Sequence, residues 1–190
     1  MAHEEMVILT RTFDFLVGQA LSYLKVTGAG LAIVANFGAA SLQDERLPNF
    51  LQDNQPEFSW QPKPVDPRLL HPELVNAIQQ ASHRVHHVLG TGFLHQVYRR
   101  ATMIELRRSG LSYEYIVRVP VEYHGHLLGH QQARLILVEG KVLLTTFALR
   151  EVTDAMTERL KGHLRCLHLK LGLLANFHGT VPTITPLRIR

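Results

Sequence analysis

The chain has 190 residues, of which 46% are hydrophobic and 19% are charged, and its formal net charge is +4 at pH 7. This composition is typical of a soluble globular protein with one core, and the mild basicity is compatible with a nucleic-acid partner. The single cysteine, Cys166, excludes an intramolecular disulfide and fits a reducing cytoplasm. The longest apolar run, residues 29–40, is shorter than the roughly 20 residues of a membrane helix. With no signal-peptide pattern present, we expect a cytoplasmic protein without membrane partners.

The first segment predicts a helix followed by a strand. Apolar residues recur at intervals of three and four over residues 8–25, which indicates a helix, and Gly28 and Gly30 are expected to end it. Residues 31–37 form a short apolar run that predicts a strand. A weaker extended piece is expected over residues 44–50.

Residues 52–72 contain five prolines, which block helix interiors and central strands. We interpret this stretch as a linker that lies against the core, with Phe58 and Trp60 holding it by packing. A second helix is predicted from Glu73, with Pro72 in its first turn.

The stretch Gly90–Tyr98 predicts a sharp bend between two helices. Gly90 and Gly92 permit backbone angles that a Cβ would forbid, and a helical pattern starts directly after them. This third helix is expected to continue to about Ser109, with Gly110 as its left-handed stop.

The remainder predicts three strands, one helix and two further strands. In chain order these are residues 113–123, 134–139, 141–147, 153–169, 171–177 and 183–190, the last as an edge strand. A helix between two strands of one sheet usually connects a parallel pair. We therefore expect strands 141–147 and 171–177 to be parallel.

Two segments of the chain resemble each other. Residues 19–38 can be aligned with residues 159–179, which places Ala35-Asn36-Phe37 over Ala175-Asn176-Phe177 with a glycine after each. Two generic helix–strand units would give a weaker match, so we favour a partial duplication.

Several ordered motifs resemble a known family. They are Val85-His86, Leu89 to Leu94, Val97-Tyr98, Glu105-Leu106, Gly110-Leu111, Val121, Tyr123, Gly125, Gly129 and Gly172 to Phe177. This pattern resembles the GxxExxY family, a branch of the PD-(D/E)XK nuclease-like superfamily. The resemblance implies an α/β, restriction-endonuclease-like core with a mixed central β-sheet flanked by helices, plus an extra N-terminal helix–strand unit. It divides the chain into a partial repeat that packs on the core (1–51), a Pro-rich linker (52–72) and a degenerate domain (73–190).

The resemblance also implies a lost metal site. Nucleases of this kind hold a divalent cation with carboxylates, while a lysine orients or activates water. The six positions that would carry such groups hold His95, Ile116, Arg134, Thr145, Phe147 and Arg159. We therefore predict no metal, no cofactor and no catalytic residue. The expected remnant is a pocket formed by His95, Arg134, Thr145, Phe147 and Arg159, in which His95, Arg134 and Arg159 bind phosphate.

Other candidate sites are weaker. His83 and His87 are spaced to face one ligand on a helix, and His124, His126 and His130 surround a turn, but neither group has the ligands of a defined metal site. Cys166 is interpreted as a buried thiol. Four arginines of the third helix would form a phosphate-binding surface if they converged with other arginines, but we favour a solvated helix face for them: Arg99, Arg100, Arg107 and Arg108.

These observations favour a catalytically inactive nuclease-like domain that binds nucleic acid or acts as a protein-interaction module, with a protein partner or a homodimer as the second option. Two alternatives stay open. One is a metal-dependent nuclease with relocated ligands, and the other is a purely structural subunit of a complex.

Overall fold

The computed structural model describes residues 13–38, 41–48, 57–62 and 69–189. The chain divides into two compact units, Met1–Asn54 and Gln55–Arg190, which we call unit 1 and unit 2 and describe separately. In the described residues, no helix has both the length and the apolar character needed to cross a membrane.

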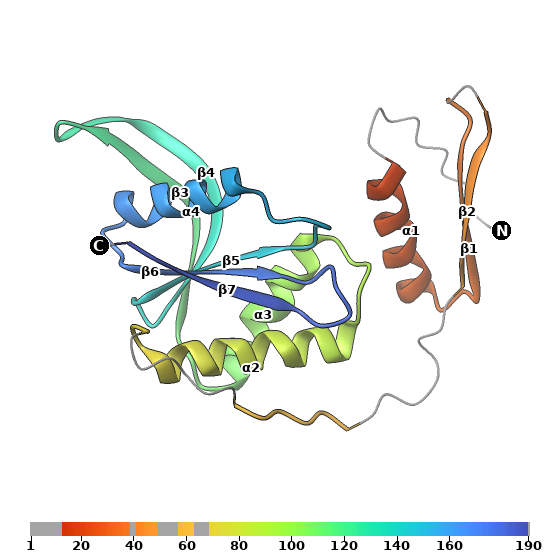
Figure 1. Cartoon of the computed structure of the whole chain (residues 1–190), viewed down its shortest axis with the longest axis horizontal. Helices are drawn as coiled ribbons and strands as arrows, with labels where there is room; N and C mark the ends of the chain where they lie inside the picture. The colour runs from red at the N-terminus through yellow and green to blue at the C-terminus, as the bar shows by residue number, and fades with distance from the viewer. Residues whose placement is uncertain (1–12, 39–40, 49–56, 63–68, 190) are drawn as a thin grey trace. The chain divides into compact units, whose positions relative to one another are not determined.

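The described part of unit 1 consists of one helix and a two-stranded antiparallel sheet (Figure 1). Its elements are α1 (Phe13–Thr27), β1 (Leu31–Asn36) and β2 (Gln43–Pro48). Leu24, Val34 and Leu47 are its buried apolar residues. Gly28 ends the helix as predicted: its φ is 67°, and its N–H donates to the Leu24 carbonyl at 3.1 Å.

Unit 2 is a five-stranded mixed sheet with helices on its faces, which confirms the predicted fold class (Figure 1). Its elements are α2 (Pro72–Leu89), α3 (His95–Arg108), β3 (Tyr113–Tyr123), β4 (His126–Val138), β5 (Val142–Phe147), α4 (Asp154–Cys166), β6 (Leu171–Asn176) and β7 (Thr183–Arg188). The strands lie in sequence order, and only β5 and β6 are parallel. The parallel pair and the edge position of β7 are both as expected.

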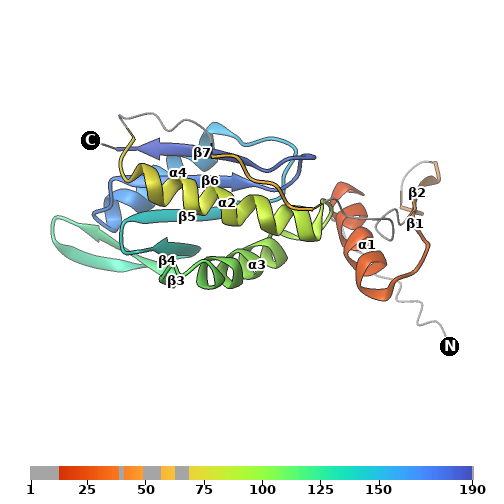
Figure 2. The same cartoon turned by 90° about the horizontal axis from the view of Figure 1, so that it is seen from below.

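The two faces of the sheet carry separate apolar clusters. Figure 2 shows α2 in front of the strands and α4 behind them. One cluster combines Ile78 of α2 and Tyr98 of α3 with alternate residues of the central strands. The other combines Leu160 and Leu164 of α4 with the intervening strand residues. This alternation follows from the two-residue period of a strand, and it assigns α2 and α3 to one face and α4 to the other.

The bend between α2 and α3 is closed by Tyr98. Gly90 and Gly92 adopt φ values of 67° and 95°. The Tyr98 hydroxyl donates to the Gly90 carbonyl at 2.7 Å and accepts from the Phe93 N–H at 3.2 Å. The Tyr98 ring stacks on Phe177, after β6, with centroids 4.6 Å apart. The bend therefore ties both helices to the central sheet.

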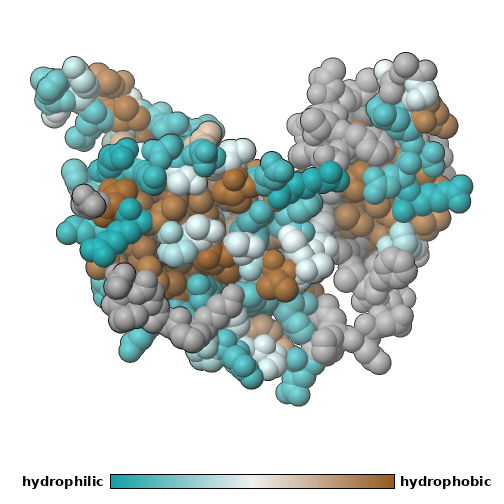
Figure 3. Space-filling view, in the orientation of Figure 1, coloured by the Kyte–Doolittle hydropathy of each residue, from teal (hydrophilic) through white to brown (hydrophobic). Residues whose placement is uncertain are grey.

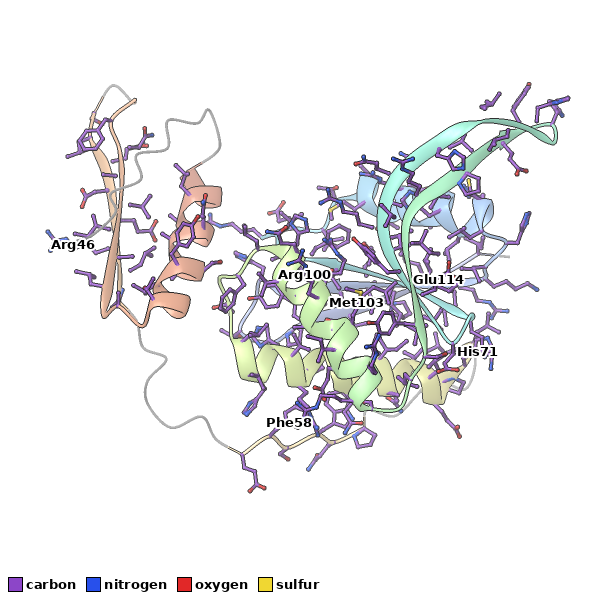
Figure 4. The ribbon with its side chains drawn as sticks, turned by 180° about the vertical axis from the view of Figure 1, so that it is seen from behind. Arg46, Phe58, His71, Arg100, Met103 and Glu114 are labelled. Atoms are coloured by element: carbon purple, nitrogen blue, oxygen red, sulfur yellow. The ribbon has the colours of Figure 1, made fainter. Side chains whose placement is uncertain are left out.

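The segment 57–62 is held against α2 by its aromatic residues, as predicted. The ring centroid of Phe58, which is labelled beside α2 in Figure 4, lies 5.4 Å from that of His87. The ring centroid of Trp60 lies 4.7 Å from that of His83. These contacts line an open cavity of about 460 Å³ beside α2. His83 and His87 thus each face an aromatic ring of this segment.

Some expectations about burial and strand length were wrong. Cys166 is exposed at the end of α4. β4 begins at His126, eight residues earlier than predicted, because its first half pairs with β3 alone and carries few of the apolar residues that mark a buried strand.

Candidate functional site

His95 is the first residue of α3. The residue before it, Leu94, has extended backbone angles, and the first turn of the helix contains no acidic side chain. Partial burial lowers the pKa of His95, and the positive charges of Arg99 and Arg134 lower it further. The same two arginines therefore lie close enough to His95 to act on its imidazole. A helix N-terminus without acids adds a positive partial charge at this point.

Arg99, one helical turn after His95, is the most unusual side chain of this group. It is only 7% exposed, and its Nε atom has no hydrogen-bond partner. Its guanidinium lies over the Tyr115 ring, 5.7 Å from the centroid. Nowhere in the described part of the chain does an acidic side chain form an ion pair with it. The interpretation of Arg99 as a solvated residue was therefore wrong.

Arg134 lies at an irregularity of β4. The register of β3 and β4 shifts between Ile116 and Arg118, and Arg134 adopts a left-handed φ of 59°. β4 pairs with β5 only over Ile136–Val138. The two strands are therefore no longer paired at Arg134 on β4 and at Thr145 on β5. A bulge of this kind bends the strand, and the charge of Arg134 lowers the pKa of His95.

Arg159 reaches the same part of β4 from α4. Its Nη2 donates to the Gln132 carbonyl at 3.2 Å, two residues from Arg134. Arg159 also lowers the pKa of the buried His163, although the larger cause is the burial of that imidazole. This part of β4 therefore bonds to α4 through Gln132 and acts on His95 of α3 through the charge of Arg134.

Thr145 and Phe147 lie on the face of β5 that is turned toward α4. Phe147 packs with the cluster on the α4 side, and Thr145 shares its face by the two-residue period. The structure thus couples His95 to Arg134 and places Arg159 two residues away, while no contact described here joins Thr145 or Phe147 to His95. One common pocket for all five residues stays a prediction.

Sequence reasoning misjudged one polar residue of this region, Arg99, and missed another, Thr146. Arg99 follows His95 at the i+4 spacing of one helix face, which is the signal that points to it. Thr146 is buried on the side of β5 that faces α3, and its Oγ1 has no hydrogen-bond partner. Thr146 alternates with Val142 and Leu144, which face the same cluster. Its burial on this face could therefore have been predicted from the two-residue period of a strand.

The acidic side chains near this region are engaged elsewhere. Glu105, nearly buried, lies 3.5 Å from Arg84 and 3.9 Å from Arg108. Glu158 pairs with Lys161 at 2.7 Å, and Glu139 accepts a hydrogen bond from the Ser112 N–H. Among the described residues, no three His, Cys, Asp or Glu side chains are grouped to hold a metal ion.

A comparison with protein-family models matches residues 72–185 to the PD-(D/E)XK nuclease superfamily. The chain belongs to this superfamily. The match runs from the start of α2 into β7 and so covers the whole five-stranded sheet apart from the end of its last strand. No curated protein and no solved structure matches the chain. Membership in the GxxExxY branch stays a prediction.

Nucleases with this fold depend on carboxylates that hold a divalent cation. At the positions that the sequence resemblance assigns to these ligands, the PD-(D/E)XK domain carries an imidazole, a guanidinium, a hydroxyl and a phenyl ring: His95, Arg134, Thr145 and Phe147. This donor set does not fit a hard divalent cation, and Arg134 would repel one. The chemistry it offers instead is the binding of anions.

Proposed function

We propose that the PD-(D/E)XK domain binds nucleic-acid phosphate through His95, Arg99 and Arg134, and does not cleave the strand. The observation that carries the proposal is Arg99, a buried guanidinium beside two other basic side chains. Burying a charge costs several kcal/mol unless it is paired, and no paired acid is described here. A phosphate oxygen beside the guanidinium would supply the missing counter-charge.

The charge of His95 supports the same assignment. Its lowered pKa keeps the imidazole largely neutral at pH 7, because partial burial and two guanidinium groups oppose protonation. A bound phosphate reverses this electrostatic balance and favours the protonated imidazole. Phosphate binding is therefore expected to take up a proton and to strengthen as the pH falls from 7.5 to 6.

Arg159 extends the basic surface on the other side of β4. Its guanidinium is exposed apart from the bond to the Gln132 carbonyl. It is thus available to a neighbouring phosphate on the same strand. Contacts from exposed arginines steer and strengthen binding without reading sequence. We therefore expect low sequence preference.

The test is fluorescence anisotropy with labelled single-stranded DNA, double-stranded DNA and RNA at 50 and 200 mM salt. The variants are Arg99→Met, which keeps a long side chain without charge, and Arg134→Glu/Arg159→Glu. Arg100→Met is the matched control, because Arg100 is the exposed neighbour on the same helix (Figure 4). We expect at least a tenfold weaker affinity for the first two variants and less than a threefold change for the control.

Each phosphate contact contributes a slope of roughly −0.9 to the dependence of log affinity on log salt for duplex DNA. Arg99→Met is therefore expected to reduce the slope by about one unit. Absence of binding at 50 mM salt contradicts the proposal. Cleavage in Mg²⁺ or Mn²⁺ by a clean preparation favours the alternative of a nuclease with relocated ligands.

A further inference from the structure

Strand β1 of unit 1 has a free edge. Within the described residues it pairs only with β2, on one side. The corresponding strand of unit 2, β6, lies between β5 and β7 and is paired on both sides. This difference matters because the two helix–strand–strand units are otherwise alike in detail.

The likeness extends to register, with a constant spacing of 140 positions between counterparts. Leu31 pairs with Pro48 as Leu171 pairs with Arg188, and Asn36 pairs with Gln43 as Asn176 pairs with Thr183. The helix of each unit is followed at the same position by a left-handed residue, Gly28 and His168. After each strand the asparagine Oδ1 accepts from the N–H two residues later, at 3.0 and 3.3 Å. Unit 1 therefore repeats the geometry of α4–β6–β7.

The repeat shows which parts of β1 lack a neighbour. In unit 2, Leu171, Leu173 and Phe177 are buried beneath α2 and α3. Their counterparts Leu31, Ile33 and Phe37 are 51%, 60% and 83% exposed. The space-filling view shows apolar surface over the described part of unit 1 (Figure 3). β6 is thus buried in unit 2. Its counterpart in unit 1, β1, is covered by none of the described residues on its outer edge and its outer face.

The edge of β1 also lacks the features that keep exposed strands from pairing. Its sequence, Leu-Ala-Ile-Val-Ala-Asn, has no charge and no proline. The outer strand beside it, β2, has three charged residues and a proline, and the edges of unit 2 carry Pro120 in β3 and Pro186 in β7. Unlike the outer strands β2, β3 and β7, β1 has neither a charge nor a proline, which leaves its edge open to addition of another strand.

We propose that β1 pairs antiparallel with β1 of a second copy of this chain, which gives a four-stranded sheet in the order β2–β1–β1–β2. A two-fold axis relates the copies, so each uses the same edge. The apolar side chains of Leu31 and Ile33 then lie beside those of the other copy on one face of the sheet.

The charges on β2 favour a second copy over a helical partner that covers the face as α2 covers β6 and β7. Asp44 and Arg46 lie opposite Ala35 and Ile33, on the same face as the exposed apolar residues. Their counterparts in unit 2 are Ile184, which packs under the helices, and Pro186. A covering helix would bury Asp44 and Arg46, whereas edge pairing leaves both in water.

A contact of two six-residue strands is smaller than a standard interface, so we expect dissociation in the micromolar range. The test is analytical ultracentrifugation of the full chain from about 1 to 200 µM. Ile33→Glu is the principal variant. It places like charges near the two-fold axis, while within its own unit the new carboxylate faces Arg46. Val181→Glu is the matched control, since Val181 is 59% exposed in unit 2.

We expect the wild type and Val181→Glu to dimerise with the same affinity, and Ile33→Glu to weaken the dimer at least tenfold. Leu31→Gln, a milder change on the same face, is expected to weaken it less. Hydrogen exchange gives a second readout, because β1 amides that face away from β2 gain protection in the dimer. A monomer at 200 µM, or a dimer that Ile33→Glu leaves intact, overturns the proposal. Nucleic-acid binding by unit 2 is a separate measurement, so either proposal can fail alone.

Discussion

Burial of the Arg99 side chain is expected to lower the stability of the protein when no phosphate is bound. The guanidinium is removed from water, and the Tyr115 ring supplies only part of the lost solvation. Replacing a buried unpaired charge with a side chain of similar volume is often neutral or stabilising. A residue that lowers stability and raises affinity is the usual mark of a binding site.

Tyr98 shows the opposite case, a polar group whose bonds hold the fold together. Tyr98→Phe removes a hydroxyl that bonds to both Gly90 and Phe93 and leaves the ring stack on Phe177 intact. We expect a loss of about 1–3 kcal/mol in the free energy of unfolding, measured by urea denaturation. Tyr123→Phe, in the exposed hairpin, is the control and is expected to change stability little. An equal effect of both changes would contradict this role of Tyr98.

The two shifted histidines predict how stability depends on pH. The pKa values of folded His95 and His163 lie below 6.5, mainly because of burial, while the unfolded chain titrates at the ordinary value. Below pH 6.5 the unfolded state therefore binds more protons, and stability falls as the pH falls. Urea unfolding between pH 7.5 and 5.5, without phosphate, is expected to show this loss. His163→Leu should flatten the profile, and an unchanged profile would rule out that contribution.

At the scale of elements, α4 and β6 fit closely at Gly172. A Cβ at this position would lie 3.0 Å from Leu160 Cδ2 and 3.2 Å from Leu164 Cδ1. Gly172→Ala is expected to cost about 1–3 kcal/mol by overpacking. In unit 1 the counterpart of Gly172 is Ala32, and the counterpart of Leu160 is Ala20. The strand residue is therefore larger than in unit 2, and the helix residue is smaller.

This pairing predicts a coupling that a double-mutant cycle measures. Gly172→Ala/Leu160→Ala should be less destabilising than the sum of the single changes, because truncation of Leu160 makes room for the new methyl group. Gly162→Ala is the control. A Cβ there meets no atom within 4 Å, so better helix propensity should stabilise the protein by about 0.5–1 kcal/mol. Strict additivity of the two core changes would disprove the contact.

The elements were largely predictable from the sequence because their signals are local. The spacing of apolar residues predicts α2, α3 and α4, and Gly90 and Gly92 predict where the bend between α2 and α3 lies. The first half of β4 was missed because a protruding two-stranded ribbon buries little and needs no apolar alternation. The electrostatic effect of Arg134 on His95 joins a helix start to a strand bulge, and only the resemblance brought the two residues together in advance. Arg99 was misjudged because arginine on a helix is usually solvated, and its burial depends on Tyr115 of another strand.

At the scale of the whole molecule, the two units have different roles in this account. Unit 2 has a complete sheet and a cationic group around β4, which we assign to phosphate. The two strands described in unit 1 pair in the register of β6 and β7, and the described residues of unit 1 include no further strand that would pair with β1. A dimer through β1 would bring two phosphate-binding domains onto one nucleic acid. Bivalent binding of this kind raises the apparent affinity without any new contact.

The most direct test of the central claim is a titration of labelled DNA with the wild type and with Arg99→Met, in the presence of Mg²⁺. We expect the wild type to bind the DNA without cleaving it, and Arg99→Met to bind it at least tenfold more weakly. We also expect Arg99→Met to unfold at an equal or higher urea concentration. Equal affinity of the two proteins would contradict the assignment of Arg99 to phosphate. Loss of both affinity and stability would show that Arg99 serves the fold instead.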